Sequence, residues 1–268
     1  MAEVLKYILY FVIAFSTTII GSISGMGGGV MMKPLYDMLN DFTATQIAVM
    51  TSTTVFTMSL VSVVSRAKSL KEENVNIKTL IFITIGAVVG GYVGQKIFAL
   101  ATSNATDYVV KIIQNSVLLV AIVFIIIYMQ NKEKVRSLNC QNVIAALFIG
   151  LGLGVISSFL GIGGGPMNVA IIVFVFGYSM KGAAVCSMFI IIFSQATKIT
   201  TMLITNGVEA FAMWLVPLVV VAGVVGALLG KAITKKLTDK GVKNFFVGAQ
   251  IFIVLLCVVN IVKYSIAL

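Results

Sequence analysis

Long apolar runs alternate with short polar stretches along the whole chain. Most of the runs approach the roughly 20 residues that an α-helix needs to cross a hydrocarbon core of about 30 Å. They are continuous and do not alternate residue by residue, which disfavours a membrane β-barrel. The pattern predicts an all-α, polytopic membrane protein with about 8–10 membrane segments. The nine runs are 4–24, 43–65, 78–100, 107–129, 142–160, 163–178, 180–204, 209–232 and 244–266.

The composition agrees with a membrane protein and narrows the function. Of the 268 residues, 59% are hydrophobic and 10% are charged, and the mean hydropathy is +1.09. A soluble domain carries about 25% charged residues. The chain has no histidine, which excludes His-based triads and most zinc sites, and its three cysteines stand singly. We therefore expect membrane lipids around the helices, and no cofactor, metal site or enzyme activity.

The chain repeats itself at an offset of 136 residues. The segment 25–29, with the sequence GMGGG, returns as GIGGG at 161–165. Seven of thirteen positions are identical between 19–31 and 155–167. Such duplication is typical of transporters built from structural repeats, so we expect one membrane domain made of repeats 1–134 and 135–268. Because the first run leads into the first motif, we expect a helix of the mature protein there and not a signal peptide.

Basic residues gather in three loops. The net charge is +10, and 12 of the 19 Lys and Arg residues lie in 66–78, 130–141 and 231–243. Positive charge marks cytoplasmic loops, and Arg66 is assigned to this topology signal. The loops that the offset makes equivalent to 66–78 and 231–243 are poor in Lys and Arg, so equivalent loops should face opposite sides. The repeats are therefore predicted to be inverted, and the charge predicts topology and no nucleic-acid partner.

The glycine motifs should break their helices. Consecutive glycines weaken a helix by about 1 kcal/mol each relative to alanine, and Pro34 and Pro166 each remove a backbone donor soon after a motif. Broken backbone inside a membrane needs protein or a water-filled cavity beside it, and it exposes helix N-termini that attract anions. We interpret 4–40 and 142–178 as glycine-broken helices or re-entrant hairpins that dip toward each other. The alternative is close helix packing, which we expect for the glycines at 86, 90 and 94.

The duplicated motifs resemble those of the TauE/SafE sulfite-exporter family, also called the TSUP permeases. Each GxGGG motif is followed by a proline within five residues and, about twenty residues later, by an Ala-Val-x-Thr/Ser stretch at 48–51 and 184–187. The resemblance covers essentially the whole chain. It implies transport of small sulfur-containing anions such as sulfite, thiosulfate or organosulfonates, although some members carry other organic anions.

Backbone amides and a few polar side chains are the candidate anion ligands. Thr51 and Ser187 hold equivalent positions in the two repeats, and Lys198 lies inside an apolar run. A hydroxyl in a helix can instead bond to its own i−4 carbonyl, and Lys198 can extend to the interface. The candidate substrate-binding residues are Gly25, Gly27, Gly28, Gly29, Thr51, Ser52, Gly161, Gly163, Gly164, Gly165, Asn168, Ser187 and Lys198.

Together these features predict a secondary permease of the plasma membrane that moves a small sulfur-containing anion by alternating access. The chain has no Walker A motif, so we expect an ion gradient to supply the energy, with a proton or sodium as the coupling ion. The alternatives are an anion channel and a transporter of a non-sulfur organic anion.

Overall fold

The chain folds into a bundle of helices. The computed structural model describes residues 2–39, 41–42, 44–73, 75–104, 107–132, 134–160, 164–206 and 215–266. Within these ranges there are ten helices and no strand, which confirms the all-α prediction. The helices are α1 (Ala2–Ser24), α2 (Gly29–Leu39), α3 (Ala44–Glu72), α4 (Ile77–Asn104), α5 (Asp107–Gln130), α6 (Val143–Leu160), α7 (Gly165–Phe176), α8 (Met180–Asn206), α9 (Leu215–Lys236) and α10 (Asp239–Ile266).

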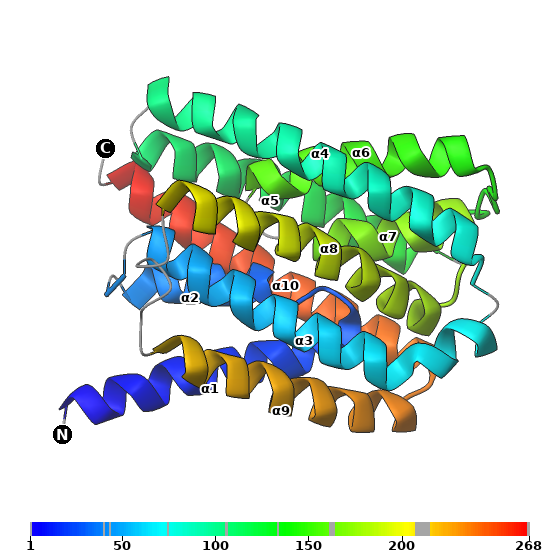
Figure 1. Ribbon diagram of the computed structural model, residues 1–268, viewed down its shortest axis with the longest axis horizontal. Helices are drawn as coiled ribbons and strands as arrows, with labels where there is room; N and C mark the ends of the chain where they lie inside the picture. Colours follow the sequence, from blue (N-terminus) through cyan, green and yellow to red (C-terminus); the bar gives the residue numbers. More distant parts are fainter. Residues whose placement is uncertain are drawn as a thin grey trace.

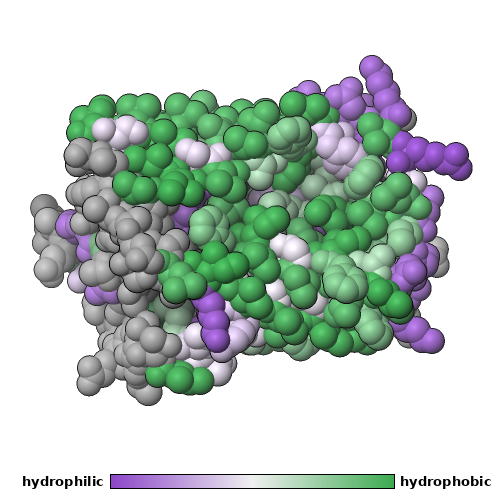
Figure 2. Space-filling model, turned by 90° about the horizontal axis from the view of Figure 1, so that it is seen from above, coloured by the Kyte–Doolittle hydropathy of each residue, from purple (hydrophilic) through white to green (hydrophobic). Residues whose placement is uncertain are grey.

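The surface of the bundle is largely apolar, as expected for a protein surrounded by lipid. Eight of the described helices are long and apolar enough to cross a membrane, and only α2 and α7 are shorter. Large apolar side chains point outward, including Phe124 at 69% and Phe148 at 67% exposure. Figure 2 shows apolar side chains over the flank of the molecule and a hydrophilic group at one end, where the basic loops lie. The chain is a multi-pass membrane protein.

Two helical hairpins enter the bundle from opposite ends. Helix α1 stops at Ser24 and α2 begins at Gly29, while α6 stops at Leu160 and α7 begins at Gly165. In Figure 1 the α1–α2 hairpin starts and finishes at the end that holds both chain termini, and the α6–α7 hairpin starts and finishes at the other end. The turn of the first hairpin lies inside the bundle, where residues 25–28 are all buried. The prediction of glycine-broken helices at the two motifs is confirmed.

Equivalent helices of the two repeats make equivalent contacts. The 136-residue offset equates α1 with α6 and α4 with α9; α1 packs along α9, and α6 packs along α4. The pairs α3 with α8 and α5 with α10, each made of equivalent helices, also pack together. This exchange of partners is consistent with a two-fold relation between the repeats. The division into inverted repeats stays a prediction that the packing agrees with.

Glycines set the closest helix–helix contacts. A Cβ at Gly90 would lie 2.0 Å from the carbonyl oxygen of Leu151, and a Cβ at Gly150 would lie 2.0 Å from that of Ile83. These distances leave no room for a side chain, so α4 and α6 touch backbone to backbone. The packing predicted for glycines 86, 90 and 94 is confirmed.

A polar cluster ties the start of α1 to the connection between α2 and α3. Lys6 Nζ lies 2.8 Å from Asp41 Oδ1, and the Tyr10 hydroxyl donates to Asp41 Oδ2 at 2.6 Å. The hydrogen bonds from Lys6 and then Tyr10 hold the pKa of Asp41 below its usual value. The cluster anchors the outer end of the first hairpin.

Candidate functional site

The two hairpins touch where their helices break. A Cβ on Gly165, the first residue of α7, would lie 1.7 Å from the carbonyl oxygen of Met26. A Cβ on Gly25 would lie 2.4 Å from the Cα of Ala184, and Gly25 has φ +78°, a conformation that favours glycine. The second half of the molecule therefore packs directly on the first glycine motif.

The other glycines of the first motif are also packed closely against neighbouring residues. Gly27 and Gly29 face the side chain of Val55, and Gly28 lies against the backbone of Thr17. All residues from 21 to 32 are buried. In this conformation the first motif is packed against protein. Gly161 and Gly163 of the second motif lie outside the described residues.

Side chains from neighbouring helices satisfy the carbonyls that the breaks leave free. The Ser187 hydroxyl donates to the carbonyl of Gly25 at 2.8 Å, and Gln114 Nε2 donates to that of Phe159 at 2.6 Å. Arg66 Nη1 donates to the carbonyl of Ser22 at 3.0 Å. Helix ends buried in a membrane require such partners. The position of Ser187, expected to bind substrate, is thus explained by the fold in this conformation.

The hydroxyls of the first repeat behave differently from one another. Thr51 Oγ1 donates to its own helix, to the carbonyl of Ile47 at 2.7 Å, which is the local alternative recognised for such residues. Ser52 is 2% exposed, and its Oγ has no hydrogen-bond partner. Neither residue lines a described pocket.

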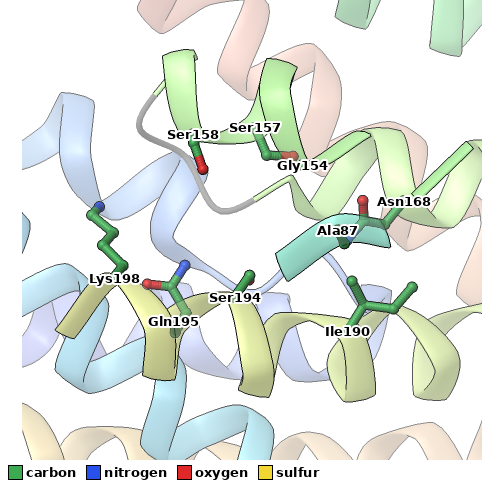
Figure 3. Close-up of a pocket in the computed structure, with 9 residues that line it drawn as sticks. All are labelled: Ala87, Gly154, Ser157, Ser158, Asn168, Ile190, Ser194, Gln195 and Lys198. Carbon is green, nitrogen blue, oxygen red and sulfur yellow. The ribbon is translucent and has the colours of Figure 1, made fainter. Parts of the chain in front are cut away.

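A small polar pocket lies between α8 and the hairpin of α6 and α7. It brings together two of the predicted residues, Asn168 and Lys198, and it borders Gly164, whose Cβ would meet Ser157 Oγ and Asn168 Oδ1. Figure 3 shows Ser158 on α6 and Gln195 and Lys198 on α8 extending into this space. The pocket is lined by Ala87, Gly154, Ser157, Ser158, Asn168, Ile190, Ser194, Gln195 and Lys198.

Two buried amides in this pocket lack partners. Asn168 is 2% exposed and Gln195 is 4% exposed, yet Asn168 Oδ1 and Gln195 Oε1 accept no hydrogen bond from the residues that the structure describes. A buried polar atom without a partner costs about 1–3 kcal/mol, so its presence needs an explanation. A polar ligand in the pocket would supply the missing partner.

The electrostatic environment of the pocket is positive. Among the described residues, its lining includes the Lys198 ammonium and no carboxylate. Lys33 of α2 lies near Lys198, and the carboxylate of Asp37 on α2 lies near Lys33. Because an intramembrane cation without a carboxylate partner is costly, the pocket suits an anion.

The sequence did not single out Ser157, Ser158 and Ser194. A signal existed for two of them: Ser158 is equivalent to Ser22 by the 136-residue offset, and Ser194 lies one turn before Lys198 on the same helix.

The pocket offers about 20 Å³ to the centres of water-sized molecules, which is room for one or two waters. The conformation described is therefore closed around the pocket.

Known proteins identify the family. A sequence profile described as Sulfite exporter TauE/SafE matches residues 10–257. The chain belongs to the TauE/SafE sulfite exporter family. This TauE/SafE chain is also similar to the "Probable membrane transporter protein YunE" of Bacillus subtilis (strain 168), at 26% identity over 263 residues, 88% of this chain and 91% of that protein. No solved structure matches it.

Family membership gives the class of function. As a TauE/SafE protein, the chain is a membrane transporter and not an enzyme, and its multi-pass bundle belongs in the plasma membrane. The resemblance seen in the duplicated glycine motifs is confirmed.

Proposed function

We propose that this TauE/SafE protein moves a small sulfur-containing anion, such as sulfite, thiosulfate or an organosulfonate, by alternating access. The observation that carries the proposal is the pocket of Asn168, Gln195 and Lys198, a buried polar site with a cation and no carboxylate. The family description supports an oxyanion of sulfur as its ligand.

The lining groups match the needs of an oxyanion. The hydroxyls of Ser157 and Ser158 can donate hydrogen bonds, and the Lys198 ammonium supplies charge. The Ser194 hydroxyl donates to the carbonyl of Ile191 in this conformation and would have to rotate to reach an anion. Rotating the side-chain amide of Asn168 or Gln195 exchanges its oxygen and nitrogen, so each can also present a donor. Several donors around one positive charge bind a tetrahedral or pyramidal oxyanion without a metal.

The closed pocket supports alternating access over an open channel. Room for one or two waters does not admit a sulfonate, so binding requires the hairpin of α6 and α7 to move away from α8. Gly164, with φ +77°, is the N-cap of α7 and provides a hinge at the turn of that hairpin. The hairpins enter from opposite ends, so each can open the site to one side.

Counterflow in proteoliposomes tests the proposal. Vesicles loaded with unlabelled thiosulfate should accumulate labelled thiosulfate in a saturable manner. Lys198→Gln should reduce uptake about tenfold or more, because a hydrogen bond to a charged group is worth about 1.5–3 kcal/mol. Lys235→Gln, which neutralises an exposed lysine at the end of α9, is the matched control and should transport normally.

The alternatives predict other results in the same vesicles. Unitary currents without counterflow would indicate an anion channel. Counterflow of carboxylates but not of sulfite, thiosulfate or sulfonates would indicate a non-sulfur substrate. Imposed proton and sodium gradients then identify the coupling ion, since only the coupled gradient drives uphill uptake.

A further inference from the structure

Arg66 is a buried cation that the pocket does not use. It ends the apolar span 46–66 of α3, is 7% exposed, and has non-helical backbone angles (φ −119°, ψ 16°) at a kink of α3. Its Nη1 donates to the carbonyl of Ser22 and its Nη2 to Ser22 Oγ, both at 3.0 Å. Its Nε is buried and has no partner.

This guanidinium contacts a hydroxyl, Ser22 Oγ, and no carboxylate among the described residues. Ser62 Oγ lies 3.2 Å from Ser22 Oγ, and Ser59 is fully buried with an unpartnered Oγ. In the part of the chain that the structure describes, the one ion pair is Lys6–Asp41, and no carboxylate acts electrostatically on Arg66. A buried arginine normally has an anionic partner, so this one lacks its counter-ion.

The 136-residue offset relates this cluster to the pocket beside α8. Ser22 is equivalent to Ser158, Ser59 to Gln195, and Ser62 to Lys198. The unpartnered atoms, Ser59 Oγ and Gln195 Oε1, hold equivalent positions. Arg66 lies one helical turn beyond Ser62, so both clusters combine hydroxyls, an unpartnered polar atom and one cation.

The two clusters lie toward opposite ends of the bundle. Arg66 is at the end of α3 where the basic loops gather, which we expect to be cytoplasmic (Figures 1 and 2). Lys198 is eight residues from the other end of α8, Asn206. Within the described residues, Arg66 is thus a buried cation toward one end of the bundle, and Lys198, with Lys33 near it, is a half-buried cation toward the other.

We propose that Ser22, Ser59, Ser62 and Arg66 form a second anion-binding station, on the cytoplasmic side, for an oxyanion of the same class as the transported substrate. This inference rests on the proposed function. Arginine holds oxyanions through parallel N–H donors, and Nε lies on the same edge of the guanidinium as Nη2, which donates to Ser22 Oγ. The anion replaces Ser22 Oγ on Nη2 and takes the free Nε, while Nη1 keeps the carbonyl of Ser22.

A purely structural role for Arg66 makes a different prediction. The carbonyl of Ser22 lies in the last turn of α1 and has no intrahelical donor, so Nη1 caps it. Capping alone needs neither the free Nε nor the buried hydroxyl of Ser59. Ser59→Ala leaves the cap intact and removes only an unpartnered atom, so it separates the two roles.

Sided transport assays test the station. In inside-out membrane vesicles, Ser59→Ala and Arg66→Lys, which keeps the charge but not the fork, should raise the half-saturating thiosulfate concentration about three-fold and about tenfold. In right-side-out vesicles both should stay within two-fold of wild type. Lys198→Gln alters the pocket that opens to either side and should raise the half-saturating concentration in both preparations, and Lys235→Gln should change neither. Equal changes on both sides, or none, in the Ser59 and Arg66 variants would overturn the station.

Ligand-dependent stability gives a readout that does not need transport. Thiosulfate, titrated at constant ionic strength set with gluconate, should raise the melting temperature of purified Asn168→Leu/Lys198→Gln protein, because the second station remains. Adding Arg66→Lys or Ser59→Ala should weaken that shift at least three-fold. If the double variant shows no shift, or the added change leaves it intact, the station does not exist. Wild-type vesicles without thiosulfate counterflow would instead refute the proposed function.

Discussion

Single side chains decide whether broken backbone can be buried in this bundle. Ser187, Gln114 and Arg66 each donate to a carbonyl near a helix break, and each comes from a different helix. The broken hairpins are therefore stabilised by contacts distant in sequence. A hydroxyl close to a glycine motif can therefore stabilise the fold by donating to a backbone carbonyl, and need not bind substrate.

Ser187→Ala should destabilise the protein by about 1–3 kcal/mol, because the buried carbonyl of Gly25 loses its donor. Thr53→Ala is the control: its hydroxyl donates to the carbonyl of Val49 on its own helix, and its removal should cost little. Denaturant unfolding in detergent measures both. Similar costs for the two variants would mean that the Ser187 bond does not support the break.

Asn168→Leu should leave stability unchanged or increase it while weakening thiosulfate-dependent stabilisation to the part that the Arg66 station supplies. The substitution removes a buried, unpartnered oxygen, whose desolvation costs free energy in the absence of ligand. Thermal melts with and without thiosulfate measure both effects. A less stable variant with the full wild-type response to thiosulfate would show that Asn168 serves the fold.

The sequence predicted which residues are polar groups inside apolar segments, but not toward which partner each side chain points. The sequence indicated that Asn168 and Lys198 are polar groups inside apolar segments, and the structure brings them to one pocket. It could not decide that Thr51 bonds its own helix and that Ser187 bonds Gly25, because both geometries suit a hydroxyl in a helix. Arg66 was assigned to topology because it stands first in a basic loop, and only its burial against Ser22 reveals another role.

At the scale of elements, absent side chains determine which helices pair. Helices α4 and α6 touch through Gly90 and Gly150, which fit only because they lack Cβ atoms. The spacing of glycines by four residues predicted a packing face. The partner of that face lies in the other repeat and is set by shape complementarity between surfaces far apart in sequence.

Two glycines of α6 should respond oppositely to alanine. Gly150→Ala places a Cβ 2.0 Å from the carbonyl oxygen of Ile83, so it should destabilise by about 1–3 kcal/mol or more. Gly152→Ala meets nothing within 4 Å and should stabilise by up to about 1 kcal/mol through helix propensity. Unfolding in detergent compares them. Equal effects would mean that helix propensity, and not contact with α4, controls these positions.

On the scale of the whole molecule, the two hairpins enter from the two opposite ends of the bundle, which we expect to face opposite sides of the membrane. The α1–α2 hairpin shares one end with both termini, and the α6–α7 hairpin shares the other end with the basic loops (Figure 1). With the basic loops in the cytoplasm, the two breaks are approached from opposite sides. This arrangement suits a transporter that opens to one side at a time.

Single cysteines should report these faces. In a background without Cys140, Cys186 and Cys257, Arg136→Cys should resist a membrane-impermeant maleimide in intact cells and react in inside-out vesicles. Asp41→Cys should behave in the opposite way, because it lies at the end of the first hairpin. Labelling of both from the same side would disprove the proposed topology.

The sequence by itself determined the solvent, the helices, the two breaks and the family, because hydropathy, glycine runs and internal repetition are local or periodic properties. The tertiary structure decided which hydroxyls cap backbone, that the first motif is packed while a pocket opens beside the second, and that Arg66 is buried among serines without a counter-ion. These outcomes depend on which side chains of other helices arrive at each position. Short-range sequence patterns do not contain that information, since it arises from packing between segments more than a hundred residues apart.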